Sequence, residues 1–337
     1  MIKKLVSLVF TLLALAAVGY FYVTKQVDVY LSQPVKIESE QLVTVPSGTS
    51  LNGALALMTK QGWIDAQFAE KLVRRFHPEL TQIKAGTYQL MPKMTLVQAL
   101  QVLVAGKEHQ FAITFVEGSR FSEWLAILQR NEHLNHQLTD RSEAEIAQQL
   151  GIEPQKLEGL FLAETYHFTK GASDLDILKR AHRKLQVILD SAWATRQDNL
   201  PLKTPYDALI LASIIEKETA VESERERIAS VFVNRLNKRM RLQTDPTVIY
   251  GMGDTYDGNI RKKDLRAPTP YNTYVINGLP PTPIAMPGEA SIRAALNPEQ
   301  SAYLYFVASG NGGHVFSKNL TDHNRAVRAY LKQLRQQ

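Results

Sequence analysis

The chain contains no cysteine among its 337 residues. Disulfide bonds, cysteine-ligated zinc and thiol nucleophiles are therefore excluded together. A chain of this length can bury enough apolar surface to fold in an oxidising compartment without disulfides. Hydrophobic residues make up 45% of the sequence and charged residues 21%. These fractions are typical of a globular protein, so the composition indicates a folded body.

Several signatures of other protein classes are missing as well. The sequence has no G-x-S-x-G nucleophile elbow, no P-loop and no dinucleotide-binding glycine fingerprint in a fitting context. The net charge of +6 is spread out, and the one dense basic cluster, 237–241, is too short to indicate nucleic acid. His314 and His323, with Asp322, lack the spacing of an H-E-x-x-H site, so hydrogen bonding is the favoured role. We expect no metal, no cofactor and no nucleic-acid partner.

A long apolar run lies near the N-terminus. Leu5–Val23 holds nineteen residues that are apolar or small apart from two hydroxyl side chains. As a helix, at about 1.5 Å per residue, it would be about 28 Å long, close to the roughly 30 Å hydrocarbon core of a bilayer. Lys3 and Lys4 precede it, so the positive-inside rule leaves residues 1–4 in the cytoplasm and sends the body across. The run predicts a single transmembrane helix over 5–23.

A cleaved signal peptide is the alternative interpretation of this run. Ala14, Leu15 and Ala16 form an A-x-A pattern of the kind found at cleavage sites. The apolar stretch continues past Ala16 to Val23, which favours a retained anchor. Both interpretations export the body of the protein.

The rest of the chain divides into a stalk, a small module and a larger domain. Residues 24–41 have mixed composition and are expected to form a short stalk. The small module is expected over 42–110. An apolar pair, a turn and an amphipathic helix recur three times, over 43–58, 88–104 and 115–128, with Ser50, Thr95 and Ser122 as helix N-cap candidates. This pattern indicates a small α+β module. The larger domain is expected over 111–337.

The larger domain is predicted to be mainly helical, with long loops and a small sheet. Ser223–Glu226 has the form of a capping box, which would open a helix running to about Arg239. Residues 243–290 are rich in Thr, Pro, Gly, Asn and Tyr, and loops of this length are usually functional. The overall fold class is therefore α+β. Further helices are predicted over 143–150, 174–193, 206–219, 289–296 and 321–335, and a strand over 303–307.

Two carboxylates lie at the C-terminal end of the helix predicted over 206–219. This helix is apolar almost all round, so it should be buried. Glu216 and Glu218 are two residues apart, about 200° around a helix, so they cannot face the same cleft. Glu218 continues the apolar stripe of Leu211 and Ile215. Desolvation there would raise its pKa and keep the carboxyl protonated, as a general acid requires. The alternative is that both glutamates form surface ion pairs.

Seven motifs in the sequence are similar to those of a known protein family. They are Glu216–Thr219, Ala229–Leu236, Leu242–Gly251, Tyr271–Tyr274, Gly278–Pro281, Tyr303–Val307 and Gly312–Phe316. Through these motifs the sequence resembles the YceG-like family, the endolytic murein transglycosylases. The resemblance covers nearly the whole chain, including the N-terminal apolar run, and involves several long motifs in the same order. One departure is that Ala163 and Glu164 stand where the family often has proline and aspartate, so no role is assigned to Glu164.

The resemblance implies a fold, a location and a reaction. The module at 42–110 would be LysM-like and 111–337 would be the YceG-like catalytic domain, in the periplasm of a bacterium and anchored in its inner membrane. The partners would be peptidoglycan glycan strands and peptidoglycan synthases in the same membrane. The reaction would cleave MurNAc–GlcNAc β-1,4 bonds within strands and leave 1,6-anhydro-MurNAc ends. The family's catalytic glutamate is the second in its E-K-E motif, which falls on Glu218.

The polar loop over 243–274, which follows the helix predicted over 206–219, supplies candidates for binding sugar. A saccharide cleft needs amide and hydroxyl groups for the sugar hydroxyls and aromatic side chains for the ring faces. Asp245 is followed by proline and could equally form a turn. The substrate-binding candidates are Gln243, Asp245, Tyr271 and Asn272, with His314 bordering the cleft.

Two other functions fit the sequence. A muramidase would hydrolyse the same bond with two carboxylates, Glu218 and Asp245, whose separation would set the stereochemistry. A non-catalytic wall-binding protein would use only the LysM-like module, and its glutamates would be structural.

Overall fold

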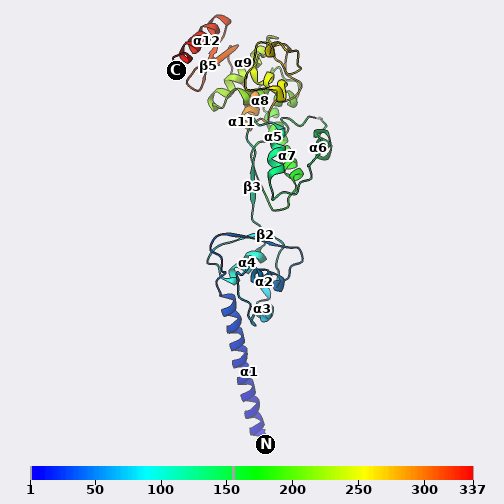
Figure 1. The fold of residues 1–337 in the computed structure, drawn as a ribbon, viewed down its shortest axis with the longest axis vertical. Coiled ribbons are helices and arrows are strands. Elements are labelled where there is room, and N and C mark those ends of the chain that lie inside the picture. Colours follow the sequence, from blue (N-terminus) through cyan, green and yellow to red (C-terminus); the bar gives the residue numbers. More distant parts are fainter. Residues whose placement is uncertain (1, 154–155, 337) are drawn as a thin grey trace. The chain divides into compact units, whose positions relative to one another are not determined.

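The computed structural model describes residues 2–153 and 156–336. It confirms an α+β fold, with two compact units that the structure defines separately (Figure 1). Unit 1 comprises Met1–Phe111 and His167–Gly171, and unit 2 comprises Ala112–Tyr166 and Ala172–Gln337. The elements of unit 1 are α1 (Ile2–Leu31), β1 (Gln41–Val45), α2 (Leu51–Lys60), α3 (Glu70–Phe76), a 3-10 turn (Pro78–Thr81), β2 (Gly86–Leu90) and α4 (Leu96–Ala105).

The core of unit 1 lies between a two-stranded sheet and its helices. β1 and β2 are antiparallel, with Gln41 opposite Leu90 and Val45 opposite Gly86. Val45 is buried like the alternate residue Val43, as expected for a strand with one face on a core. Ser50 caps α2, and Thr95 forms a capping box at the start of α4, as the sequence predicts.

The N-terminal helix is longer than the predicted 5–23. α1 is long and apolar enough to cross a membrane, and it continues to Leu31, through residues expected to belong to a stalk. Val27, Tyr30 and Leu31 are buried in the core of unit 1. They follow the i, i+3, i+4 spacing of one helix face, and burial of this face extends the helix beyond its apolar run. Figure 1 shows the rest of α1 projecting from the unit.

Unit 2 is built around α8 (Pro205–Glu218). This helix packs against α7 (Asp174–Ala194), α9 (Arg225–Asn237), α10 (Asp245–Met252) and α11 (Glu289–Leu296). Its residues from Ala208 to Ile215 are all buried, which confirms the buried helix predicted from its composition. The other helices described in unit 2 are α5 (Phe121–Arg130), α6 (Glu143–Leu150) and α12 (Leu320–Leu334), with 3-10 turns at Glu222–Glu224, Gly253–Thr255 and Asp264–Arg266. The predicted N-cap Ser122 is wrong, because this residue lies inside α5, whose N-cap is Arg120.

Two further two-stranded sheets are present in the described part of the chain. β3 (Phe111–Thr114) pairs with β4 (Thr165–Phe168). β5 (Tyr305–Ala308) pairs antiparallel with β6 (His314–Ser317), and α12 packs against both. β5 overlaps the strand predicted over 303–307 but begins two residues later.

The predicted capping box at Ser223–Glu226 is wrong. Ser223 lies inside the 3-10 turn, and α9 begins only at Arg225 with no side-chain cap. The Glu224 carboxylate is instead bound by His314, a residue 90 positions further along the chain. It accepts hydrogen bonds from the backbone N–H of His314 at 3.0 Å and pairs with its ring at 2.7 Å.

Candidate active site

Glu218 is the last residue of α8, and its environment follows from that position. Thr204 and Asp207 form a capping box at the start of the helix, which then runs through the core of unit 2. Glu218 and Glu216 point to different surroundings, as their 200° separation predicts. Glu216 accepts a hydrogen bond from the backbone N–H of Gly288 at 3.0 Å, at the N-terminus of α11. Glu218 instead lines a cleft.

The cleft beside Glu218 has a volume of about 410 Å³. Cavities of roughly 300–1,000 Å³ are typical of ligand sites. The lining combines hydroxyl, amide and aromatic side chains, which suits a polar ligand with flat ring faces. Besides Glu218 the cleft is lined by Phe232, Arg235, Leu242, Gln243, Thr244, Asp245, Tyr274, Tyr305, Phe306, Leu320, His323 and Asn324.

The carboxyl group of Glu218 has a pKa near neutrality. Its pKa is raised from 4.5 to about 7, mainly by burial and also by the negative charge of Asp245. The hydroxyl of Thr244, which donates a hydrogen bond to Glu218 Oε1, acts in the opposite direction, as does the nearby ring of His314. A pKa near neutrality allows one group to donate a proton and then to accept one.

Arg235 holds the wall of the cleft in place. Its guanidinium is buried and donates hydrogen bonds to the carbonyl oxygens of Leu304 (2.6 Å), Arg241 (3.0 Å) and Leu242 (2.9 Å), and to the side-chain oxygen of Gln243 (3.3 Å). This one side chain therefore joins the segment before α10 to the segment before β5. Both segments contribute residues to the cleft.

A cluster of threonines fixes Thr244 below the carboxyl group. The backbone N–H of Thr244 donates to the hydroxyl of Thr273 at 3.1 Å, and its carbonyl accepts from Thr247 at 2.7 Å. Thr247 and Thr273 are hydrogen-bonded to each other at 2.9 Å, and all three are buried. Gln243 enters this turn with a φ of 53°, a left-handed conformation that costs energy for residues other than glycine. The backbone is thus held so that the Thr244 hydroxyl faces Glu218.

Among the predicted substrate-binding residues, Gln243 and Asp245 lie on the cleft wall with Glu218. Asp245 is exposed and is the first residue of α10. One of its oxygens accepts a hydrogen bond from the hydroxyl of Tyr274 at 2.6 Å. Tyr274 was visible in the sequence as part of the same polar loop, and the structure adds it to the site.

Tyr271 and Asn272 do not line this cleft. The Tyr271 hydroxyl is hydrogen-bonded to Thr282 at 2.9 Å, and its ring packs edge-on against Tyr250. Asn272 is fully buried, and its amide donates to the carbonyl oxygens of Asp264 (3.1 Å) and Ala267 (2.8 Å). These contacts hold the long loop together.

His314 lies behind the cleft and acts on it through charge. It does not line the cavity, because its ring is paired with Glu224. Its charge still reaches Glu218, where it favours the ionised carboxylate. In the described part of the chain, no group of three or more His, Asp or Glu residues is placed to bind a metal.

His323 and Asn324 join the site from α12, more than a hundred residues after Glu218. The ring of His323 stacks on Tyr305 with centroids 5.1 Å apart. Its pKa is lowered by burial and by the charge of Arg235, so the ring is neutral at neutral pH. The sequence offered only a weak metal hypothesis for His323. The amphipathic pattern of the last helix predicts which of its faces is apolar, but it does not predict that this face borders the cleft.

The chain is similar to known proteins in sequence and in fold. A model of the YceG-like family matches residues 43–329. The chain belongs to the YceG-like family. An endolytic murein transglycosylase of Bacillus subtilis (strain 168) is 33% identical to this family member over 321 residues, covering 89% of the chain and 88% of the relative.

Two further relatives of this YceG-like protein are consistent with that assignment. An endolytic murein transglycosylase of Streptococcus pneumoniae (strain ATCC BAA-255 / R6) is 26% identical, covering 97% of the chain and 65% of the relative. A crystal structure of a protein described as yceG-like, from Listeria monocytogenes, matches with a TM-score of 0.52 and 30% identity. It covers 86% of the chain and 99% of the other protein.

The hydrogen bond from Thr244 gives a test of the electrostatics around Glu218. Thr244→Val keeps the shape of the side chain but removes the donor that favours the ionised carboxylate. We expect the pKa of Glu218 to rise further, so that the alkaline limb of the pH–activity profile moves to higher pH. The measurement is kcat/KM against pH, and Thr255→Val, in an exposed turn, is the control. An unshifted limb would contradict the role of this hydrogen bond.

Proposed function

We propose that this YceG-like protein is a membrane-anchored endolytic transglycosylase that cleaves MurNAc–GlcNAc β-1,4 bonds within peptidoglycan strands. The observation that carries the proposal is one carboxyl group, Glu218, with a pKa of about 7 in a polar cleft. The relatives named as endolytic murein transglycosylases support the substrate class and the reaction.

In the proposed mechanism Glu218 acts first as an acid. Its protonated carboxyl donates the proton to the glycosidic oxygen as the bond from that oxygen to C1 of MurNAc breaks, and the GlcNAc-bearing part leaves with a free hydroxyl. Positive charge develops at C1. The newly formed carboxylate, next to the negative charge of Asp245, stabilises that charge electrostatically. The raised pKa keeps much of the carboxyl protonated at neutral pH, so that the proton for this first step is available.

Glu218 then acts as a base. Its carboxylate removes the proton from the C6 hydroxyl of the same MurNAc while the C6 oxygen bonds to C1. The 1,6-anhydro ring closes, and Glu218 returns to its protonated state. No water is consumed, so a single group with balanced acidity is sufficient. Gln243, Asp245 and Tyr274 are proposed to hold the sugars on the cleft wall.

A muramidase is the second candidate, and the position of Asp245 on the same cleft favours it. Asp245 would act as the second carboxylate, and a water molecule would open the bond. The products of the two reactions differ by the mass of one water. A non-catalytic wall-binding role is the third candidate. It predicts that the wild-type protein does not cleave glycan, so no substitution in the cleft would change cleavage.

His323 is proposed to bind the sugar as a neutral donor. Its Nδ1 is buried without a hydrogen-bond partner. An unpaired acceptor costs less than an unpaired donor, so the proton belongs on Nε2. We expect His323→Phe, which keeps the ring on Tyr305, to raise KM about fivefold to tenfold with little change in kcat, because one hydrogen bond is lost. Steady-state kinetics, with Tyr330→Phe on the same helix as control, test this. Unchanged KM would contradict the role.

The absence of cysteine allows a direct test of membrane topology. The N-terminus is proposed to be cytoplasmic and the body periplasmic, with α1 as the anchor. Single cysteines at Ile2 and Ser39, both exposed, can be labelled with a membrane-impermeant maleimide in intact spheroplasts. We expect Ser39→Cys to react and Ile2→Cys to react only after permeabilisation. The opposite pattern would reverse the topology, and a mature chain lacking Ile2 would indicate a cleaved signal peptide.

A further inference from the structure

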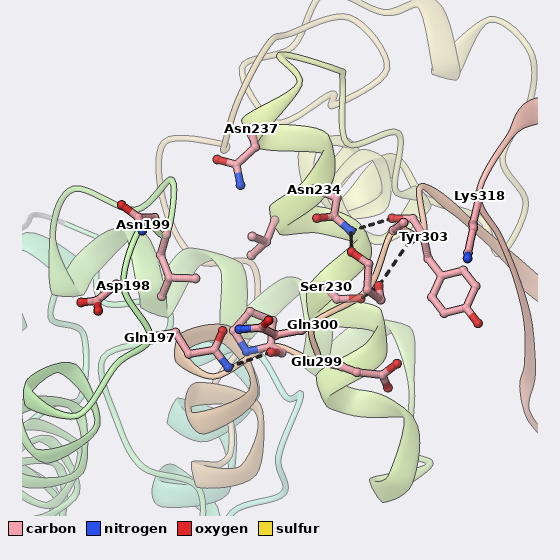
Figure 2. A pocket seen from close by; sticks show the side chains of 15 residues that line it. Gln197, Asp198, Asn199, Ser230, Asn234, Asn237, Glu299, Gln300, Tyr303 and Lys318 are labelled. Carbon is pink, nitrogen blue, oxygen red and sulfur yellow. Dashed lines mark hydrogen bonds between the residues drawn. The ribbon is translucent and has the colours of Figure 1, made fainter.

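A second, larger pocket lies on unit 2, apart from the cleft of Glu218. Its volume is about 630 Å³, and Figure 2 shows its polar side chains converging from a loop before α8, from α9 and from the segment before β5. We refer to it as the α9 pocket. It is lined by Gln197, Asp198, Asn199, Leu200, Ser230, Val233, Asn234, Asn237, Pro298, Glu299, Gln300, Ser301, Ala302, Tyr303 and Lys318.

The helix α9 separates this pocket from the catalytic cleft. Ser230, Asn234 and Asn237 line the α9 pocket at the i, i+4, i+7 spacing of one helix face. Phe232 and Arg235 face the catalytic cleft. A helix with its side chains is about 10–12 Å across, so the two cavities are roughly one helix diameter apart.

One chain segment also connects the two cavities. The side-chain amide of Asn234 donates to the carbonyl oxygens of Ser301 and Tyr303, each at 3.0 Å. The next residue, Arg235, binds the carbonyl oxygen of Leu304 at 2.6 Å. Tyr303 lines the α9 pocket, and Tyr305, two residues later, lines the cleft. The two cavities therefore share a wall that consecutive residues of α9 hold rigidly.

The chemistry of the α9 pocket indicates the class of its ligand. Asn199, Asn237 and Gln300 are exposed, and none makes a side-chain hydrogen bond to another part of the described chain. They present amide donors and acceptors to the cavity, beside the ring of Tyr303. Glu299 is already paired with Arg227 at 2.8 Å, which leaves Asp198 and Lys318 as charges of opposite sign. A lining this polar and this nearly neutral suits an uncharged ligand with many hydroxyl and amide groups.

We propose that the α9 pocket is an accessory subsite for N-acetylated sugar residues of the glycan strand whose bond is cleaved beside Glu218. The inference rests on the proposed function and extends it. An enzyme that cuts inside a strand binds sugars on both sides of the scissile bond, and the cleft, at about 410 Å³, is small for a long strand. Two connected sites on one strand bind far more tightly than either site alone when the geometry permits both contacts. The pocket thereby favours long strands over short fragments.

The test uses the full-length chain with Glu218→Gln, so that glycan is bound but not cleaved. Because the protein has no cysteine, Gln300→Cys can be modified selectively with a bulky maleimide that fills the α9 pocket. Gln149→Cys, an exposed position on α6, is the matched control. Binding is measured by calorimetry with long peptide-free glycan strands and with a short oligosaccharide of the same repeat, before and after modification.

We expect modification at Gln300→Cys to weaken binding of the long strands at least about tenfold, because the linked contact is lost. Binding of the short oligosaccharide and the Gln149→Cys control should not change. If long strands bind equally well with the pocket filled, the subsite is overturned and the proposed function stands. If neither glycan binds even the unmodified protein, the proposed function fails. If stem peptide without glycan competes for the pocket, the ligand is peptide and the saccharide assignment is wrong.

Discussion

Replacing Glu218 by Gln is expected to reduce glycan cleavage by about 10²–10⁴-fold, the usual contribution of a group that transfers protons in the transition state. The amide cannot donate the proton that the leaving oxygen needs, and it cannot accept the proton of the C6 hydroxyl. The measurement is release of soluble products from purified peptidoglycan. Glu216→Gln is the matched control, because Glu216 bonds to Gly288 outside the cleft. Equal activity in wild type and Glu218→Gln would contradict the mechanism.

The Glu218→Gln substitution should also change how the free energy of unfolding depends on pH. The pKa of Glu218 is about 7 in the folded protein and 4.5 by its ordinary value, so the folded state binds more protons between these pH values. The free energy of unfolding therefore falls as pH rises from about 4.5 to 7. Gln removes this contribution. We expect Glu218→Gln to be more stable than wild type above pH 7, by up to about 3 kcal/mol, and similar to it near pH 4.5.

Glu158 provides an internal reference for that experiment. It is buried, accepts a hydrogen bond from the backbone N–H of Phe121 at 3.0 Å, and has its pKa raised to about 7 by burial. It lies outside the catalytic cleft and is retained in Glu218→Gln. Part of the pH dependence of stability should therefore remain in the variant, and only the part due to Glu218 should disappear.

Arg235→Met is expected to lower the free energy of unfolding by about 3 kcal/mol and to abolish most activity. Methionine fills the space of the side chain but leaves the carbonyl oxygens of Leu304, Arg241 and Leu242 without their donor. Each buried acceptor left unpaired costs about 1–3 kcal/mol, partly recovered by relaxation. The cleft wall then loses the link between its two segments.

Urea unfolding and steady-state kinetics measure the two effects. Arg328→Met, on the exposed face of α12, is the matched control and should change the stability by less than about 0.5 kcal/mol. A stable Arg235→Met with normal kinetics would show that the loop holds its shape without the guanidinium. That outcome would show that Arg235 is not needed to form the site, and it would not affect the role proposed for Glu218.

The fold was largely predictable where periodicity was strong. The helices at 143–150 and 289–296 agree with the structure to the residue, and α7 differs from its prediction by one. The buried helix ending near Glu218 was predicted because its apolar residues run all round. The mixed composition of residues 24–41 predicts a stalk. In the structure residues 24–31 instead continue α1, and one face of this helix is buried in unit 1.

The candidate site was only partly predictable, for physical reasons. Glu218, Gln243 and Asp245 are near one another in sequence. The apolar stripe of its helix predicts the position of Glu218, and the polar loop that follows predicts those of Gln243 and Asp245. Asn272 belongs to the same polar loop, but whether an amide faces a cavity or the loop's own carbonyls depends on tertiary packing. His323 comes from the last helix, and no local pattern indicates which distant cleft its face will meet.

The mass of the products that the wild-type protein forms from peptidoglycan distinguishes a mechanism with Glu218 alone from hydrolysis. If Glu218 alone transfers the proton in both directions, the new MurNAc ends are 1,6-anhydro rings, each lighter by one water than a hydrolysed end. Mass spectrometry of purified digests should therefore show anhydro ends from the active protein and none from Glu218→Gln. Reducing MurNAc ends that incorporate oxygen from labelled water would contradict this account and identify a hydrolase.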